Sequence, residues 1–151
     1  MSVTVETADP RVPAVAALIG ESHALMRSLF PPEDNFHYSL DELTAAHITF
    51  FVARRGGDTL GTGALADMGD YGEVKQMYVA EPARGTGTGG LLLARIEDTA
   101  RAKGLPALML ETGNLLHAAH RLYARAGFTE RGPFGDYPAA NSSVFMEKRL
   151  G

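Results

Sequence analysis

The chain has 151 residues, of which 45% are hydrophobic and 21% charged, and these values are typical of a single soluble globular domain. Its net charge of −4 argues against binding to a nucleic acid backbone, because proteins that grip phosphates usually carry a basic face. There is no cysteine, which excludes disulfides, thiolate metal sites and cysteine nucleophiles and fits a cytoplasmic protein. The sequence shows neither a signal peptide nor an apolar run of ~20 residues, so we expect no contact with a membrane.

The N-terminal third predicts a strand and two helices. Residues 2–7 alternate valines with polar residues, which is typical of a strand. Asp9 can cap a helix that has Pro10 at its first position, and two consecutive prolines end this helix. Ser39, followed three residues later by Glu42, has the spacing of a capping box and predicts a short second helix.

The middle of the chain predicts three antiparallel strands. Residues 48–54 are rich in branched and aromatic side chains, and a Gly-Gly-Asp turn joins them to a hairpin partner at 59–65. Residues 73–79 alternate again and predict a third strand. Strict alternation gives this strand two faces, with Val74, Gln76 and Tyr78 on one and Glu73, Lys75, Met77 and Val79 on the other.

The C-terminal half predicts a helix over 87–103, a buried strand over 107–112 and a second helix over 115–126, with Gly104 and Gly127 ending the two helices. A strand, a helix and a further strand predict a right-handed parallel crossover. Residues 128–132 and 144–150 predict the last two strands.

A glycine-rich loop precedes the first of these two helices. Arg84 is followed by four glycines within six residues, and a leucine-rich helix begins directly after them. The N-terminus of a helix has unpaired N–H groups, and glycines let the backbone approach phosphate oxygens closely. A single glycine would predict only a flexible turn, whereas this cluster favours a pyrophosphate-binding loop.

Two nucleotide-binding motifs compete for this loop. A P-loop ends in Gly-Lys-Ser/Thr, but this loop ends in Gly-Gly-Leu. The dinucleotide pattern G-x-G-x-x-G matches at Gly85, Gly87 and Gly90, and Glu111 falls where a ribose ligand is expected. However, residues 80–84 separate the loop from its strand, and a hairpin and a third strand come first. An NAD(P)-binding oxidoreductase is therefore the runner-up enzyme class.

The loop also resembles the acyl-CoA pyrophosphate loop of the GCN5-related N-acetyltransferase (GNAT) superfamily, through Val79, Pro82, Arg84, Gly87 and Gly89. A second signature, Leu-Tyr-x-x-x-Gly-Phe, is present at 122–128. The resemblance extends to a bacterial subgroup in which some members are named for indoleacetate. It implies one domain over residues 1–151, of α/β class and GNAT fold, with a mixed sheet of six to seven strands and about four helices.

The resemblance also implies an N-acetyltransferase that uses acetyl-CoA as its co-substrate, and it assigns residues to the donor site. The loop amides would hold the pyrophosphate, and the end of the third strand would pair with the pantetheine arm. The predicted cofactor-binding residues are Met77, Tyr78, Val79, Arg84, Gly85, Thr86, Gly87, Thr88, Gly89, Gly90, Asn114 and Tyr123. Asn114 lies two residues away from the position where many members have their asparagine.

Two residues are predicted to move protons. Tyr123 is the candidate general acid, because a phenol stays protonated at neutral pH and can protonate a leaving thiolate. Glu73 is the candidate general base, since the resemblance gives that part of the strand this role. An ion pair between Glu73 and Lys75, two residues further on the same face, is the structural alternative.

The acceptor is expected to be a small-molecule or peptide amine, which attacks directly in a ternary complex. The candidate acceptor residues are Glu33, His37, Tyr38, Tyr137 and Ser143. His117 and His120 have no third ligand nearby in the sequence, so we expect no metal. A homodimer is possible by resemblance, and a module that binds acyl-CoA without turnover is an alternative function.

Overall fold

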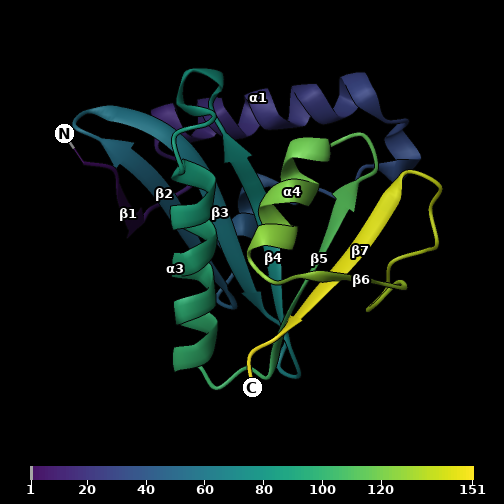
Figure 1. Cartoon of the computed structure of the whole chain (residues 1–151). Coiled ribbons are helices and arrows are strands. Elements are labelled where there is room, and N and C mark those ends of the chain that lie inside the picture. The colour runs from purple at the N-terminus through teal and green to yellow at the C-terminus, as the bar shows by residue number, and fades with distance from the viewer. Residues whose placement is uncertain (1) are drawn as a thin grey trace.

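Seven strands form one mixed sheet, in the order β1-β2-β3-β4-β5-β7-β6, in the computed structural model, which describes residues 2–151 (Figure 1). The strands are β1 (Thr4–Thr7), β2 (Ile48–Arg55), β3 (Asp58–Asp67), β4 (Gly72–Val79), β5 (Ala107–Gly113), β6 (Thr129–Arg131) and β7 (Ser143–Arg149). The helices are α1 (Pro13–Leu29), α2 (Leu40–Leu43), α3 (Thr88–Ala102) and α4 (His117–Arg125), with short 3-10 helices η1 (Pro32–Asp34) and η2 (Glu81–Ala83). The predicted fold class and order of elements are confirmed.

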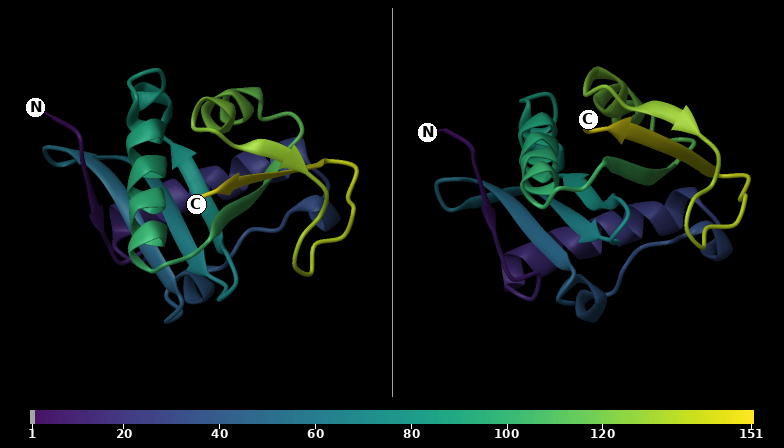
Figure 2. Two further views of the ribbon diagram at one scale, coloured as in Figure 1. Left: turned by 60° about the horizontal axis from the view of Figure 1, so that its bottom comes forward. Right: turned by 90° about the horizontal axis from the view of Figure 1, so that it is seen from below.

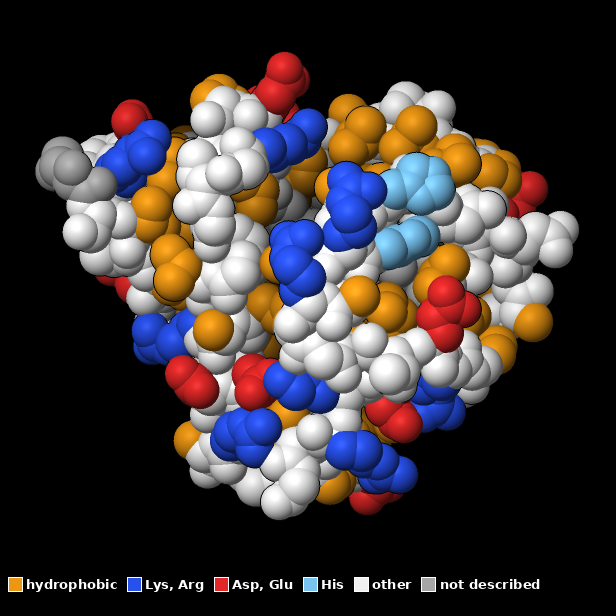
Figure 3. Space-filling view, in the orientation of Figure 1, with side chains coloured by type: hydrophobic (Ala, Val, Ile, Leu, Met, Phe, Trp, Pro, Cys, Tyr) orange, Lys and Arg blue, Asp and Glu red, His pale blue; other side chains and the backbone are white. Residues whose placement is uncertain are grey.

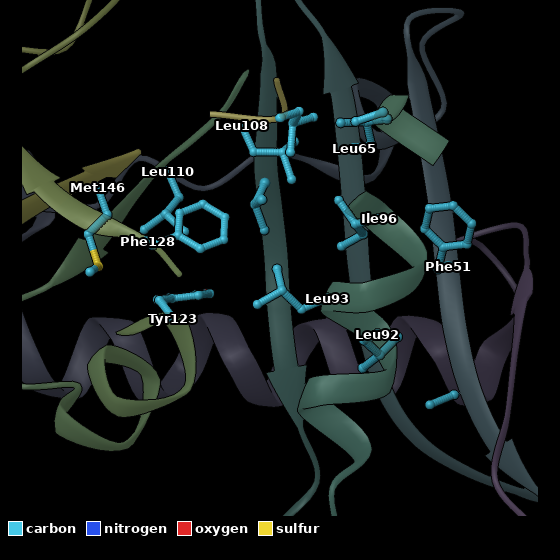
Figure 4. Packing of buried hydrophobic residues seen from close by; sticks show 14 of the residues in the cluster. Phe51, Leu65, Leu92, Leu93, Ile96, Leu108, Leu110, Tyr123, Phe128 and Met146 are labelled. Carbon is cyan, nitrogen blue, oxygen red and sulfur yellow. The ribbon is translucent and has the colours of Figure 1, made fainter. Parts of the chain in front are cut away.

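The sheet is covered on both faces. Figure 2 shows α1 on one side of it and both α3 and α4 on the other. The larger core lies on the α3 side, where Leu92, Leu93 and Ile96 pack against the strands, and Tyr123 and Phe128 extend this core under α4 (Figure 4). A smaller core fills the α1 side. Burial of these apolar side chains is the main force that holds the helices on the sheet.

The sheet opens between β4 and β5. These strands run parallel, as the crossover predicted, but they pair only at Gly72 with Leu108 and at Glu73 with Met109. Beyond these residues they diverge, whereas β5 stays paired with β7 along its whole length from Ala107 to Gly113. Within residues 2–151, the rest of β4 therefore has no strand partner on its β5 side, and its backbone groups there are available to a ligand.

A β-bulge interrupts β4. Its register against β3 shifts between Thr62 and Ala64, and Gln76 has a positive φ of 55°. Val74, Met77 and Val79 consequently all pack on the α3 side. The predicted strict alternation along β4 was wrong, because an extra residue on one strand reverses which face the following side chains occupy.

Most predicted element ends are close to those observed. The capping box of Ser39 and Glu42 is present at the start of α2, and Gly104 and Gly127 have positive φ after their helices. The predicted start of α1 was wrong, since this helix begins at Pro13 and not at Pro10. Asp9 instead accepts a hydrogen bond from the backbone N–H of Arg11, which forms a turn before the helix. Among the helices of residues 2–151, none combines the length and apolar character that crossing a membrane requires.

Candidate functional site

A pocket of about 130 Å³ lies where β4 and β5 separate. Its floor is formed by residues 74–77 of β4 and 111–113 of β5. One wall comes from α1 and the loop that follows it, and the opposite wall comes from the start of α4. The divergence of two central strands thus creates a cavity that is lined by elements from both covering layers.

Tyr123 of α4 contributes a hydroxyl group to this pocket. Its side chain is 5% exposed, and its ring packs against Phe128 with 5.8 Å between centroids. The hydroxyl has no hydrogen-bond partner within residues 2–151 and is not sealed from the pocket. Burial, and to a smaller extent the charge of Glu111, raise the pKa of Tyr123 above its ordinary value. The group is therefore a protonated donor at every physiological pH.

The glycine-rich loop lies at the end of β4. Gly85 and Gly87 have positive φ values of 76° and 85°, which side chains rarely adopt, and Gly87 is the N-cap of α3. The amides of the first turn of α3 have no carbonyl partner within the helix. Arg84 folds back and donates from Nε to the carbonyl oxygen of Val79 at 3.0 Å. Figure 3 shows Lys and Arg side chains gathered beside this loop and over α4.

These two features together fit a long, anionic ligand. The free edge of β4 offers backbone groups to an extended arm, as an added strand would use them. The loop adds amides and a cationic end of a helix, which suit a diphosphate. Both belong to one continuous segment, so one molecule can contact the two at once.

Glu73 lies behind the pocket instead of lining it. Its side chain is 3% exposed, and its carboxylate accepts a hydrogen bond of 2.5 Å from the Tyr137 hydroxyl. The ion pair with Lys75 is present, with 3.6 Å between Nζ and Oε2. Lys75 also donates to the Tyr137 oxygen at 2.9 Å and to the carbonyl of Phe36 at 3.0 Å. This network joins β4 to the two loops around the pocket.

The residues predicted for the acceptor lie in different places. His37 and Tyr38 line the pocket, and Tyr137 belongs to the network of Glu73 and Lys75. Ser143 donates to Glu111 at 2.8 Å. Glu33 is exposed on η1 and does not line the pocket, whereas its neighbour Asp34 does.

Asn114, predicted to contact the cofactor, follows β5. Its backbone N–H donates to the carbonyl of Ser142 at 2.8 Å, and its side chain is exposed. It does not line the pocket between β4 and β5. The backbone hydrogen bond of Asn114 connects the end of β5 to the loop before β7.

His23, Gln76 and Glu111 line the pocket and were not among the predicted site residues. His23 of α1 lies 3.1 Å from the side-chain oxygen of Gln76 and stacks on His37 with 3.9 Å between ring centroids. Burial lowers the pKa of His23, and the charge of His37 lowers it further. Glu111 also lines the pocket, and burial raises the pKa of its carboxyl group. In the sequence, His23 follows the apolar spacing of its helix and therefore resembles a core residue.

No group of side chains within residues 2–151 is arranged to hold a metal ion. His117 and His120 lie together on α4, with 5.8 Å between ring centroids. The ring of His120 contacts the carbonyl oxygen of Gly113 at 2.8 Å, so it fastens α4 to the end of β5.

Comparison with known proteins gives consistent matches. The profile of the acetyltransferase (GNAT) family matches residues 17–128. The chain is 46% identical over 151 residues to a protein of Azospirillum brasilense named IAA acetyltransferase, and 99% of each chain is covered. It is 34% identical over 139 residues to the uncharacterized N-acetyltransferase YsnE of Bacillus subtilis strain 168, covering 90% of this chain and 92% of YsnE. A solved Klebsiella pneumoniae structure assigned as an acyl-CoA N-acyltransferase is 32% identical, with a TM-score of 0.82 over 99% of this chain and 98% of that one.

Proposed function

This chain belongs to the acetyltransferase (GNAT) family, and we propose that it transfers the acetyl group of acetyl-CoA to a small primary amine held in the pocket between β4 and β5. Acetyltransfer with acetyl-CoA as co-substrate is the activity of the family, and the identity of the acceptor is our proposal. The observation that carries it is the opening of the sheet beyond Glu73, which leaves a free strand edge that leads to the glycine-rich loop and forms a pocket lined by Tyr123. We further propose that residues 1–151 act as one catalytic domain.

The donor site uses backbone more than side chains. We assign the diphosphate to the amides of residues 85–90 and to Arg84, and the pantetheine arm to the edge of β4 at Met77, Tyr78 and Val79. An amide of this edge then faces the thioester oxygen and stabilises the negative charge that develops on it. The bulge at Gln76 supports this role, since it turns the strand backbone at the point where pairing with β5 has already ended.

The acyl transfer is direct, because the sequence holds no cysteine that could carry the acetyl group. The neutral amine attacks the carbonyl carbon of the thioester, and the bond from carbon to sulfur breaks. Tyr123 donates its proton to the departing sulfur, since its raised pKa keeps the hydroxyl protonated until the thiolate forms. The free hydroxyl of a buried tyrosine beside the strand gap supports this assignment.

Glu73 is the base that the sequence predicts, but its side chain does not line the pocket. Its carboxylate is buried against Lys75 and Tyr137, so it can act as the base only if a relay carries the proton from the acceptor. The variant Glu73→Gln tests this route. If kcat/KM of the variant at low pH equals that of the wild type, Glu73 is not the base, because the demand for a base is greatest where the amine is protonated.

The pocket favours a small acceptor with an aromatic group. Its volume of about 130 Å³ is close to the ~150 Å³ of an apolar protein cavity that accepts benzene. Phe30, Phe36 and Tyr38 supply aromatic walls, and the carboxyl groups of Asp34 and Glu111 supply negative charge for an ammonium group. We therefore propose arylalkylamines as the acceptor class, and IAA belongs in the same panel because the Azospirillum brasilense relative is named for it.

The experiment is thiol release from acetyl-CoA with a panel of phenethylamine, tryptamine, IAA, aminoglycosides and peptides, together with thermal shift. We expect acetyl-CoA to raise the melting temperature and an arylalkylamine to accelerate thiol release above the rate of hydrolysis. Stabilisation by acetyl-CoA without acceleration by any amine would favour the module that binds acyl-CoA without turnover. Stabilisation by NAD and not by acetyl-CoA would overturn the proposed function.

A further inference from the structure

A histidine of α1 faces the bulged segment of β4 across the pocket. His23 is partly buried and lines the pocket together with Gln76 and Tyr123. Its Nε2 atom lies 3.1 Å from Oε1 of Gln76. Because α1 and α4 cover opposite faces of the sheet (Figure 2), His23 and Tyr123 approach the same cavity from opposite sides.

The contact with Gln76 fixes the tautomer of the imidazole. An amide oxygen only accepts hydrogen bonds, so Nε2 carries the hydrogen and donates it. The lone pair is then on Nδ1, which has no hydrogen-bond partner within residues 2–151. A neutral imidazole with one nitrogen anchored and the other free has the arrangement of a general base.

Gln76 is itself held in an uncommon conformation. Among residues 2–151 it is the one residue other than glycine with a positive φ, at 55°. The buried hydroxyl of Thr62 donates to its carbonyl oxygen at 2.8 Å. Strained backbone of this kind persists only where surrounding contacts impose it, and it is frequent at active sites. The strain here aims the Gln76 side chain at α1 directly beside the free edge of β4.

The surroundings of His23 favour its neutral form. Burial, the neighbouring His37 and the charge of Arg27 lower its pKa, and only the bond to Gln76 raises it. Besides the two stacked rings, the charged and titratable groups of this region are Arg27 on α1, Asp34 and Tyr38 in the following loop, Glu42 on α2, Lys75 on β4, Glu111 on β5 and Tyr123 on α4. The neighbouring charges that act on the pKa of His23 are those of His37 and Arg27, and both lower it.

We propose that His23 is the catalytic base that deprotonates the acceptor ammonium, and that Gln76 is the positioning residue that orients its ring; this rests on the proposed function. Nδ1 takes one proton from the ammonium and later releases it to solvent. The amine nitrogen forms its bond to the acetyl carbon as the bond to sulfur breaks. The second amine proton replaces the one that Tyr123 gives to the thiolate, so the net products are the amide, the thiol and one proton.

The test is the pH dependence of kcat/KM for His23→Gln, with acetyl-CoA and phenethylamine, or whichever amine of the panel the wild type acetylates fastest. The control is His47→Gln, which removes an exposed histidine before β2 and should match the wild type at every pH. We expect His23→Gln to be slower by about 100-fold at pH 7. The loss should shrink toward about 1-fold near pH 10, because an alkylammonium with a pKa of about 10.4 then loses its proton unaided.

The variant Gln76→Asn tests the role of His23 even if His23→Gln folds poorly. Gln76→Asn tolerates the positive φ but is too short to reach the ring. Because the bond to Gln76 raises the pKa of His23, the acid limb of the profile should move to lower pH in Gln76→Asn. An unmoved limb, or an equal loss at all pH values in His23→Gln, would overturn the role of His23. Failure of the wild type to acetylate any amine would instead overturn the proposed function.

Discussion

The hydroxyl of Thr62 on β3 donates to the carbonyl oxygen of Gln76 on β4 at 2.8 Å, and the side chain of Thr62 is completely buried. This bond fixes the bulge that reverses the faces of β4. The bulge sends Gln76 toward α1 and Met77 toward α3. One buried hydroxyl on a neighbouring strand thus determines which side chains of β4 face α1 and which face α3.

Thr62→Val removes that donor while keeping the size of the side chain. We expect the free energy of unfolding to fall by about 1–3 kcal/mol, because a buried carbonyl is left unsatisfied, and kcat to fall with it. Urea denaturation and steady-state kinetics measure the two effects. Thr62→Ser keeps the hydroxyl and should retain more of both; equal losses in the two variants would show that the hydrogen bond does not hold the bulge.

Gly87→Ala tests the phosphate-binding loop. Apart from its neighbours along the chain, no atom of residues 2–151 lies within 4 Å of the added methyl group, but Gly87 has a φ of 85°. The strain should cost about 1–2 kcal/mol and turn the loop amides, so KM for acetyl-CoA should rise. Gly20→Ala is the matched control, since it lies within α1 and its added methyl also meets nothing. Gly20→Ala should stabilise the protein by about 0.5–1 kcal/mol and leave KM for acetyl-CoA unchanged. If KM for acetyl-CoA were also unchanged in Gly87→Ala, the loop would not be the donor site.

Tyr123→Phe tests the general acid. We expect kcat to fall by about 10²-fold, with KM for acetyl-CoA and the melting temperature little changed, because the hydroxyl has no partner within residues 2–151. Burial raises the pKa of Tyr123 above its ordinary value of 10.0. The group therefore stays protonated as pH rises, and the wild type should show no alkaline loss of kcat below about pH 10. Full activity in the phenylalanine variant would remove Tyr123 from the mechanism.

Lys75→Met tests the buried network behind the pocket. The side chains of Lys75 and Glu73 are 9% and 4% exposed, so the substitution leaves a buried carboxylate without its cation. We expect a loss of about 3–5 kcal/mol in the free energy of unfolding, measured by urea denaturation. The double variant with Glu73→Gln should recover much of this loss, because it also removes the charge. If the double variant were no more stable than Lys75→Met, the pair would not be coupled.

The sequence predicted the order of elements because each one carries its own local pattern. Gly104 and Gly127 ended their helices, and the pair of Ser39 and Glu42 began another. The bulge at Gln76 was not predictable, because it depends on a hydrogen bond from Thr62 on a different strand. Asp9 has the chemistry of a helix cap, but it bonds to Arg11 in a turn instead.

In the candidate site too, residues of local motifs were predictable from the sequence and residues brought together by the fold were not. The glycine loop and Tyr123 belong to contiguous motifs, so both could be proposed from the sequence alone. His23, Gln76 and Glu111 meet only because the strands diverge, and that divergence has no local signal. The carboxyl group of Glu73 was singled out by its position in the strand, while its burial behind Lys75 and Tyr137 depends on two distant loops.

The central claim is direct transfer of an acetyl group from acetyl-CoA to an amine in the pocket between β4 and β5. The most direct measurement is mass spectrometry of the protein and the small molecules after incubation with acetyl-CoA labelled in its acetyl group and the best amine of the panel. The account predicts that the label is found on the amine nitrogen, in equal amount to the released coenzyme A, with none on the protein. Label found only in free acetate, or on a side chain of the protein before it reaches the amine, would contradict it.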